Sequence, residues 1–228
     1  MEKKEAEPGS PFKDPKICFL GNYPPKECGI ATFTKDLVTS MNRKFNPKLR
    51  SRVIALNDED AHYNYDNKVI LNFTRNSPEK YVEIAKQVNE SPDHKLVCIQ
   101  HEFGIFGGEY GNHLLYFLDE INKPVVLTFH SILPNPDRER KRIVKEIVSK
   151  CSAVIVMAEA AVDILNRDYG IERSKIYVIH HGIPSSRFIS PDSYKKKLKL
   201  EGRQVILTFG LLSRGKGIEY MIKSLPLL

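Results

Sequence analysis

Pro124-Val125-Val126-Leu127-Thr128-Phe129-His130 holds a continuous apolar run, and Val154-Ile155-Val156 repeats the pattern further along the chain. Apolar runs without polar alternation are typical of strands that are buried on both faces of a parallel sheet. Longer amphipathic segments separate these two runs from each other and from five similar ones. This alternation predicts an α/β fold with a doubly wound, Rossmann-like parallel sheet and right-handed crossovers.

The pattern places seven strands along the chain. They are expected at Lys16–Gly21, Ser51–Leu56, Lys68–Phe73, Lys95–Gln100, Pro124–His130, Ala153–Met157 and Lys175–His180.

Helix signals occupy the segments between the strands. Apolar residues at helical spacing predict a helix from Thr32 to Phe45, and Ser77 followed by Pro78 marks the start of another. A third helix is expected from Asn135 or Pro136 to about Lys150. A fourth is expected over Glu159–Asp168, because Gly170 suits the position just beyond a helix end.

The alternation of strand and helix breaks near residue 184. Residues 1–15 are expected to be a flexible lead-in to a Rossmann-like domain over residues 16–184, and the polar, Lys-rich residues 185–202 an inter-domain linker with a short helix. Residues 203–228 open with an apolar run, Arg203–Gly210, which predicts a strand, followed by a helix from Lys216. One strand and one helix cannot bury a core of their own, so these residues are expected to be the truncated start of a second domain.

The composition excludes several classes of protein. The 228 residues are 41% hydrophobic and 28% charged, which excludes wholesale disorder. No uncharged apolar stretch approaches the roughly 18 residues of a membrane helix. The charged N-terminus lacks the apolar region of a signal peptide, so a cytoplasmic location is expected.

The net charge is +7, from 35 Lys and Arg against 28 Asp and Glu, and part of it is clustered. Five cations lie in one segment (Arg138, Arg140, Lys141, Arg142 and Lys145) and four in another (Lys195, Lys196, Lys197 and Lys199). Each cluster fits a solvated helix face, or attraction to an anionic membrane or a phosphate-bearing molecule. No nucleic acid is expected, because neither cluster is interleaved with stacking aromatic residues.

Polar residues and glycines follow several strands at their carboxyl ends, where open α/β sheets bind ligands. Four of the seven histidines fall on this rim: His101, His130, His180 and His181. Gly29 precedes a predicted helix N-terminus, where free N–H groups favour an anion. An ordinary strand-to-helix turn is the alternative for Gly29, and a structural role is the alternative for each histidine.

Several familiar chemistries are missing. The four cysteines (Cys18, Cys28, Cys98 and Cys151) form no CxxC pair, and His101-Glu102 is not followed by a histidine at the HExxH spacing. No metal is therefore expected. No GxSxG motif is present either, which weakens the hypothesis that the protein is a hydrolase.

The last loop, Gly210–Gly217, nearly matches a P-loop, but Gly217 replaces the Ser or Thr that would hold Mg²⁺. Arg214 and Lys216 in this glycine loop could anchor a diphosphate at the start of a helix. Two solvated cations are the alternative.

Five segments together resemble family 4 glycosyltransferases of the GT-B fold, and they occur in order from about Ile17 to the last residue. They are Tyr23–Phe33, His101–Gly108, Thr128–His130, His181–Ile183 and Gly210–Gly217. The resemblance implies two facing Rossmann-like domains. The N-terminal one would mainly hold the acceptor, and the C-terminal one would hold most of a nucleotide-sugar donor, with retention of configuration and no metal or other cofactor.

The resemblance also implies roles for particular residues. Cys28 and Gly29 would approach the donor, and His130 would sit against the transferred sugar as a catalytic residue. Arg214 and Lys216 would bind the donor and neutralise the departing diphosphate. His101, Glu102, Gly107 and Gly108 would belong to the acceptor side, for a carbohydrate or lipid-linked acceptor.

The chain departs from the family pattern in two ways. Leu211 stands where many members have Arg, and the downstream pair of glutamates that grips the donor is missing. The resemblance therefore implies an N-terminal portion that is inactive alone, with a partner chain as one way to complete the second domain. The alternative is a non-catalytic module that binds a glycan, a partner or, as a peripheral protein, the inner membrane face.

Overall fold

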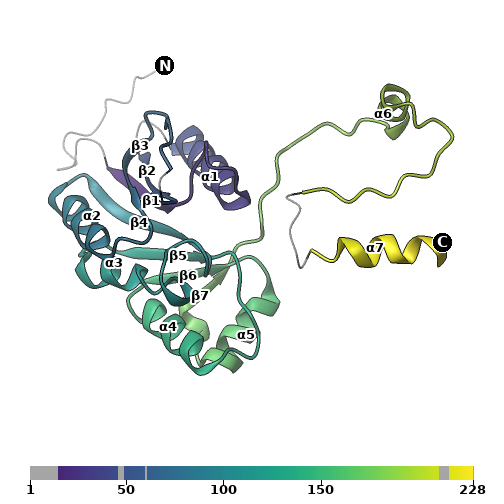
Figure 1. Ribbon diagram of the computed structural model, residues 1–228. Helices are drawn as coiled ribbons and strands as arrows, with labels where there is room; N and C mark the ends of the chain where they lie inside the picture. The colour runs from purple at the N-terminus through teal and green to yellow at the C-terminus, as the bar shows by residue number, and fades with distance from the viewer. Residues whose placement is uncertain (1–14, 46–48, 60, 211–215, 228) are drawn as a thin grey trace, which may run out of the picture. The chain divides into compact units, whose positions relative to one another are not determined.

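The computed structural model describes residues 15–45, 49–59, 61–210 and 216–227. The chain forms two compact units that divide between His181 and Gly182 (Figure 1).

The first unit is built on one parallel sheet of seven strands, in the order β3-β2-β1-β4-β5-β6-β7. The strands are β1 (Lys16–Gly21), β2 (Arg50–Asn57), β3 (Val69–Thr74), β4 (His94–His101), β5 (Val125–Phe129), β6 (Ala153–Val156) and β7 (Ile176–Val178). Every neighbouring pair is parallel. The predicted doubly wound α/β fold is confirmed, and each strand lies within three residues of its expected bounds.

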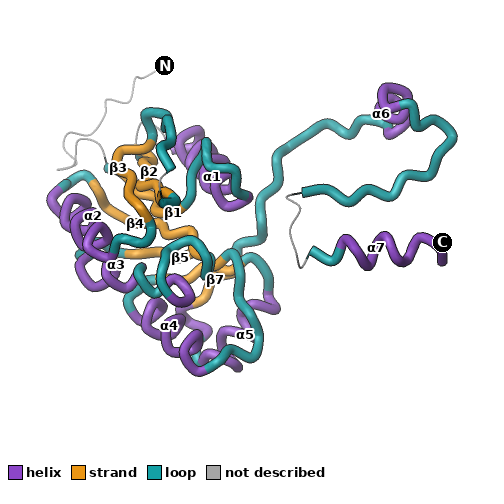
Figure 2. The backbone as a smooth tube through the Cα atoms, in the orientation of Figure 1, coloured by secondary structure: helices purple, strands orange, loops and turns teal. Residues whose placement is uncertain are grey.

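Helices follow the strands and cover the sheet on both faces (Figures 1 and 2). They are α1 (Gly29–Phe45), α2 (Pro78–Glu90), α3 (Leu114–Glu120), α4 (Arg138–Ser149) and α5 (Glu159–Tyr169), with short 3₁₀ turns at Glu109–Gly111 and Arg173–Lys175. The expected helix ends at Pro78 and before Gly170 are confirmed, and Gly170 adopts the left-handed conformation with φ of 70°. Helix α3 was not predicted, because it is short and has no side-chain cap.

The two faces of the sheet bury different side chains, because successive residues of a strand point to opposite faces. Ile17 and Phe19 of β1 pack in a cluster with Val38 of α1. Cys18 and Leu20 pack on the other face in a larger cluster that includes residues of α2, α3 and α4. Burial raises the pKa of the Cys18 and Cys151 thiols to about 12, so both thiols stay protonated near pH 7.

The order of the strands reverses between β1 and β4. The chain runs outward from β1 to β2 and β3, and then returns to place β4 on the other side of β1. In open α/β sheets this switch point leaves a crevice beyond the carboxyl ends of the strands. The residues that follow β1 and end β4 therefore lie at the position where the fold itself favours a ligand.

The second unit contains α6 (Pro191–Leu198) and α7 (Ile218–Ser224), followed by a 3₁₀ turn at Leu225–Leu227. The prediction of a strand over Arg203–Gly210 is wrong: these residues have no regular structure (Figure 2). A strand needs a hydrogen-bonded neighbour, and the described part of this unit offers none. The apolar side chains of the segment are exposed, with Phe209 at 87%.

Candidate site at the carboxyl ends of β1, β4 and β5

The site begins at the N-terminus of α1, which follows β1 through residues 22–28. The first helical hydrogen bond runs from Thr32 N to Cys28 O at 3.1 Å, so the N–H groups of the residues between them point out of the helix end without a partner inside it. No acidic side chain lies in the first turn of this 17-residue helix. The end of α1 therefore carries an uncompensated positive dipole, which favours an anion.

Gly29 keeps this helix end open. A Cβ atom built on Gly29 would meet nothing within 4 Å, so packing does not demand a glycine here. Cys28 precedes it and is half-buried, and its Sγ accepts a hydrogen bond from Asn22 Nδ2 at 3.5 Å. Of the two predicted donor-binding residues at this helix end, Gly29 is the one that leaves free space beside the backbone.

His130 and His181 lie against one aromatic ring on α1. The ring of Phe33 is 4.8 Å from that of His130 and 5.0 Å from that of His181, measured between centroids. Phe33 is four residues after Gly29, which places both on the same face of the helix. The structure thus brings the predicted anion position and the predicted catalytic histidine to one side of α1.

The imidazole of His130 is neutral near pH 7. Burial, and then the neighbouring His181, lower its pKa to about 4. Its Nε2 lies 2.9 Å from Oε1 of Gln100, a fully buried residue of β4. A neutral imidazole exchanges hydrogen bonds with uncharged groups and does not neutralise a diphosphate, so charge compensation must come from elsewhere.

His101 is placed differently from the other predicted site residues. Its side chain is fully buried at the end of β4, stacked on Phe106 with edge contacts to Phe103 and Phe129. Burial, and then His130, lower the pKa of His101 to about 3. A bound molecule does not reach this ring unless the loop that covers it moves. His101 therefore has a structural role: it packs beneath the loop after β4.

The loop after β4 is tightly packed at its glycines. Gly107 and Gly108 have φ of 71° and 65°. A Cβ atom on Gly107 would overlap the carbonyl oxygen of Arg75, and one on Gly108 would overlap Oδ1 of Asn112. These glycines are required by the backbone, whereas Glu102 is half-exposed and its carboxylate has no ion pair in the described part of the chain.

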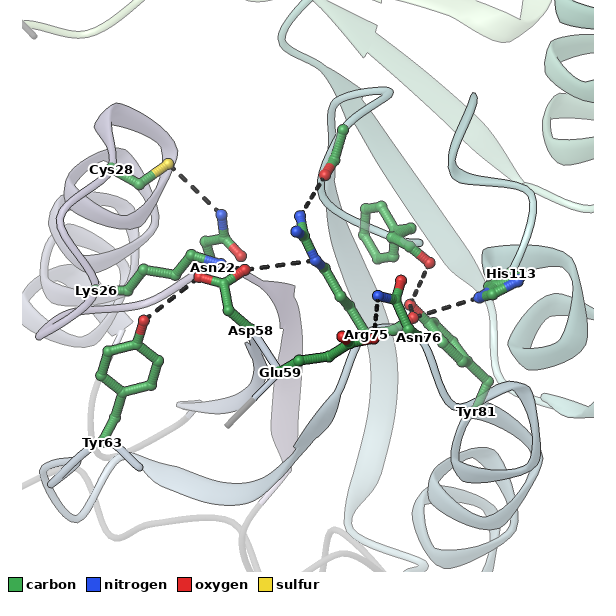
Figure 3. Close-up of polar contacts among 12 residues, drawn as sticks. Asn22, Lys26, Cys28, Asp58, Glu59, Tyr63, Arg75, Asn76, Tyr81 and His113 are labelled. Carbon is green, nitrogen blue, oxygen red and sulfur yellow. Dashed lines mark hydrogen bonds and ion pairs between the residues drawn. The ribbon is translucent and has the colours of Figure 1, made fainter. Parts of the chain in front are cut away.

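Sequence reasoning missed a network that ties the rim loops together (Figure 3). Asp58, which follows β2, pairs with Lys26 Nζ at 2.9 Å and Arg75 Nε at 3.4 Å. Burial opposes ionisation of Asp58, but the hydrogen bond from Lys26 and the charges of Lys26 and Arg75 hold its pKa below the usual value. Arg75 Nη1 also donates to Gly104 O at 2.7 Å. Asp58 directly follows β2 and Arg75 directly follows β3. These positions at strand ends were the sequence signal that could have identified the two residues as part of the rim.

Two predicted residues belong to the second unit. Arg214 lies outside the described residues, and Lys216 is exposed just before α7. Neither is placed relative to the rim of the first unit.

Elsewhere in the described residues we searched for a metal site, a membrane-spanning helix and a second ligand pocket. No group of three His, Cys, Asp or Glu residues could hold a metal ion there. None of the described helices is long and apolar enough to cross a bilayer. A hollow of about 550 Å³ between β3 and α2 is lined by residues such as Asn72, Ser77 and Gln87, and contains none of the predicted site residues.

The family model for Glycosyltransferase Family 4 matches residues 29–187, which is more than half of the chain. The chain belongs to glycosyltransferase family 4. The matched range includes α1, the four histidines of the rim and the whole loop after β4. A comparison with curated protein sequences gives no significant match.

Three solved structures similar to this family 4 chain are complexes of an alpha-glucosyltransferase. The complex with UDP and a 13-mer DNA containing a HMU base has 13% identity and a TM-score of 0.48, over 75% of this chain and 43% of that one. The complex with UDP and a 13-mer DNA containing a central A:G mismatch has 13% identity and a TM-score of 0.41, and the match covers 63% of this chain and 37% of that one. The complex with UDP-glucose and DNA containing an abasic site has 12% identity and a TM-score of 0.49, over 74% and 43%. The chain spans less than half the length of each of these chains, and likeness of this degree assigns no role to any residue.

Proposed function

We propose that this chain is the acceptor-side portion of a retaining glycosyltransferase, which moves a sugar from a nucleotide-sugar donor to a carbohydrate or lipid-linked acceptor. Membership of family 4 supports the reaction class. On this proposal residues 16–184 form the acceptor-side domain, residues 185–202 the linker, and residues 203–228 the start of the donor domain.

One observation carries the proposal: Phe33 joins an open helix N-terminus to a neutral histidine at the switch point of the sheet. Gly29 leaves space for an anionic group at the start of α1, and the Phe33 ring contacts His130. A nucleotide sugar has an anionic diphosphate directly bonded to an uncharged, hydroxyl-rich ring. The two halves of such a donor match the two halves of this rim.

In the proposed mechanism the rim acts by positioning and by electrostatic stabilisation. The bond between the anomeric carbon and the diphosphate oxygen breaks, and its electron pair leaves with the diphosphate. A hydroxyl oxygen of the acceptor bonds to the anomeric carbon on the same face, and the departing diphosphate takes the proton of that hydroxyl. The N–H groups at the start of α1 stabilise the growing negative charge. Arg214 and Lys216 are proposed to add the positive charge that neutral His130 does not supply. Lys216→Ala in the native-length protein is expected to lower turnover, and an unchanged rate would remove Lys216 from this role.

The chain alone is proposed to be inactive, because the glutamate pair that grips the donor in the family is not in its sequence. Incubation of the purified chain with a panel of nucleotide sugars tests this: we expect no sugar transfer, and robust turnover would contradict it. The intact mass of the native protein in its source cells complements this assay. A mass well above 26.1 kDa would show that residues outside this chain complete the enzyme.

A second function, a module that binds a partner chain, is favoured by the exposed apolar residues of the second unit. Ile183 and Phe188 are 86% and 91% exposed. A partner chain that completes this unit would cover them. Sedimentation over a range of concentrations tests self-association: we expect assembly, and a monomer at every concentration would count against a second copy as that partner.

The exposed face of α4 supports a weaker proposal about the acceptor. Arg138, Lys141 and Lys145 are exposed on it, whereas Arg142 is paired with Glu139 and Glu146 at 2.6 and 2.8 Å. We propose a cytoplasmic protein that contacts an anionic membrane surface peripherally and binds no nucleic acid. Vesicles of anionic lipid should retain the chain at low salt, and an oligonucleotide should not; the reverse pattern would contradict both statements.

A further inference from the structure

His130 is held from two sides by β4. Its backbone N–H donates to His101 O at 2.9 Å, which extends the β4–β5 pairing by one residue beyond β5. Its ring Nε2 lies 2.9 Å from Gln100 Oε1. Phe33 meets the ring edge to face, with the planes at 86°, which fixes its orientation from the side of α1.

Gln100 is itself immobilised. Its side chain is fully buried at the end of β4, and Gly21 of the neighbouring strand β1 leaves room for it. A Cβ atom on Gly21 would lie 3.2 Å from Cβ of Gln100, closer than side chains normally pack. A buried amide in this position has no freedom to follow a ligand, so it acts as a fixed partner for His130.

The chemistry of this contact determines where the imidazole carries its proton. Gln100 presents its carboxamide oxygen to the ring, whereas its amide nitrogen is buried and has no hydrogen-bond partner among the described residues. A carboxamide oxygen only accepts hydrogen bonds, so in this arrangement Nε2 of His130 is the donor. Because the ring is neutral near pH 7, with a pKa of about 4, it carries one proton. Nδ1 then has a free lone pair, and no described residue donates a hydrogen bond to it.

We propose that Gln100 is a positioning residue that holds neutral His130 as the Nε2–H tautomer, so that Nδ1 offers a hydrogen-bond acceptor to a hydroxyl group of the bound sugar. The identity of that hydroxyl rests on the proposed function, but the tautomer does not. A phosphate oxygen would meet a lone pair at Nδ1 and be repelled. The rim therefore has two neighbouring positions of opposite character: N–H donors at α1 for the anion, and an acceptor at His130 for an uncharged hydroxyl.

The tautomer can be measured directly in the chain by long-range ¹H–¹⁵N correlation spectra of ¹⁵N-histidine-labelled protein near pH 7. We expect the proton on Nε2 of His130, with the signal assigned by its loss in His130→Gln. A proton on Nδ1 in the unsubstituted chain would overturn the proposal. This measurement needs no donor and no turnover, so its failure is distinguishable from failure of the proposed function.

Two substitutions of Gln100 test whether this residue determines the tautomer of His130. Gln100→Met removes the acceptor with little change in volume, and both tautomers of His130 should then be populated. Gln100→Glu replaces the amide with a carboxylate, which should raise the pKa of His130 and place protons on both ring nitrogens. His113, whose Nδ1 lies 3.4 Å from Arg75 O, should be unchanged in both variants, as should every histidine in the surface control Gln87→Met. An unaltered Nε2–H form in folded Gln100→Met would show that Gln100 does not set the tautomer.

In the native-length enzyme Gln100→Met should lower kcat/KM about 5- to 10-fold, the range expected for one neutral hydrogen bond. Gln100→Glu should not recover this loss, because an imidazolium has no free lone pair at Nδ1. If both tautomers of His130 are populated in Gln100→Met and kcat/KM is unchanged, no hydroxyl group of the sugar donates to Nδ1 of His130.

Discussion

The ring of Phe33 on α1 meets the imidazole of His130 edge to face, with 4.8 Å between the ring centroids. This contact couples the helix whose N-terminus is open at Gly29 to the strand end that presents His130. Because Phe33 also contacts His181, one aromatic side chain orients two of the four histidines on the rim.

Phe33→Leu should lower the free energy of unfolding by about 1 kcal/mol, since it keeps apolar volume but removes two aromatic contacts. Urea denaturation measures this change, and ring-proton NMR signals of His130 and His181 should shift together. Phe45→Leu, at the exposed end of the same helix, is the control and should leave both signals in place. Unmoved histidine signals in Phe33→Leu would show that the ring does not position them.

Gly29→Ala should separate binding from stability. Alanine favours a helix over glycine by up to about 1 kcal/mol, and the added methyl group meets no protein atom within 4 Å, so stability should be unchanged or slightly raised. The methyl group would occupy the space that we assign to the donor, so the affinity of the native-length protein for a nucleotide diphosphate should fall. Calorimetric titration measures the affinity.

Gly104→Ala is the matched control for Gly29→Ala, because a Cβ atom there also meets nothing within 4 Å. It should change neither stability nor nucleotide affinity. Equal affinities for Gly29→Ala and Gly104→Ala would contradict the assignment of the donor phosphates to the start of α1.

Gly107→Ala should destabilise the protein by more than about 2 kcal/mol. Its φ of 71° costs an L-residue roughly 1–2 kcal/mol, and the new Cβ atom would overlap the backbone oxygen of Arg75. Thermal unfolding of Gly107→Ala beside Gly104→Ala measures the difference. Similar unfolding temperatures for the two variants would mean that the loop after β4 is not held against Arg75.

The buried histidines should make stability depend on pH. Burial lowers the pKa of His101 to about 3, against about 6.5 in an unfolded chain, so the unfolded state binds more protons between these values. The contribution of neutral His101 to the free energy of unfolding is therefore complete above about pH 6.5 and is lost as the pH falls toward 3. Urea midpoints between pH 7 and pH 5 should therefore decrease, in a range where the carboxylates scarcely titrate.

His101→Leu should make this pH dependence shallower. His94 and His130, whose pKa values are also lowered mainly by burial, account for the part that remains. The same slope in His101→Leu and the unsubstituted chain would show that His101 does not titrate on unfolding in this range.

The sequence predicted the sheet well because buried parallel strands need continuous apolar runs, and those of β5 and β6 are unbroken. It predicted Arg203–Gly210 wrongly because the same apolar pattern forms a strand only where another strand pairs with it. The short helix α3 escaped notice because it has no cap and depends on packing of its buried residues Leu114 and Phe117.

Part of the candidate site was also visible in the sequence. Gly29 and the histidines follow apolar runs, and the carboxyl ends of parallel strands share one rim, so their gathering was predictable. The contacts that define their chemistry were not. Gln100 reads as an ordinary strand residue, and the pairing of Asp58 with Lys26 and Arg75 joins loops that are far apart in the chain. Such partners depend on tertiary geometry, which residue spacing does not encode.

We propose that a sugar is transferred at the rim formed by Gly29, Phe33 and His130. The most direct test is sugar transfer by the native-length protein from a panel of nucleotide sugars, compared with its folded His130→Ala and Gly29→Ala variants. We predict transfer from at least one donor, with a loss of about 10-fold or more in His130→Ala, which removes a neutral hydrogen bond and the ring packing, and a smaller loss in Gly29→Ala. Transfer at the same rate in all three proteins would show that this rim is not the site of transfer.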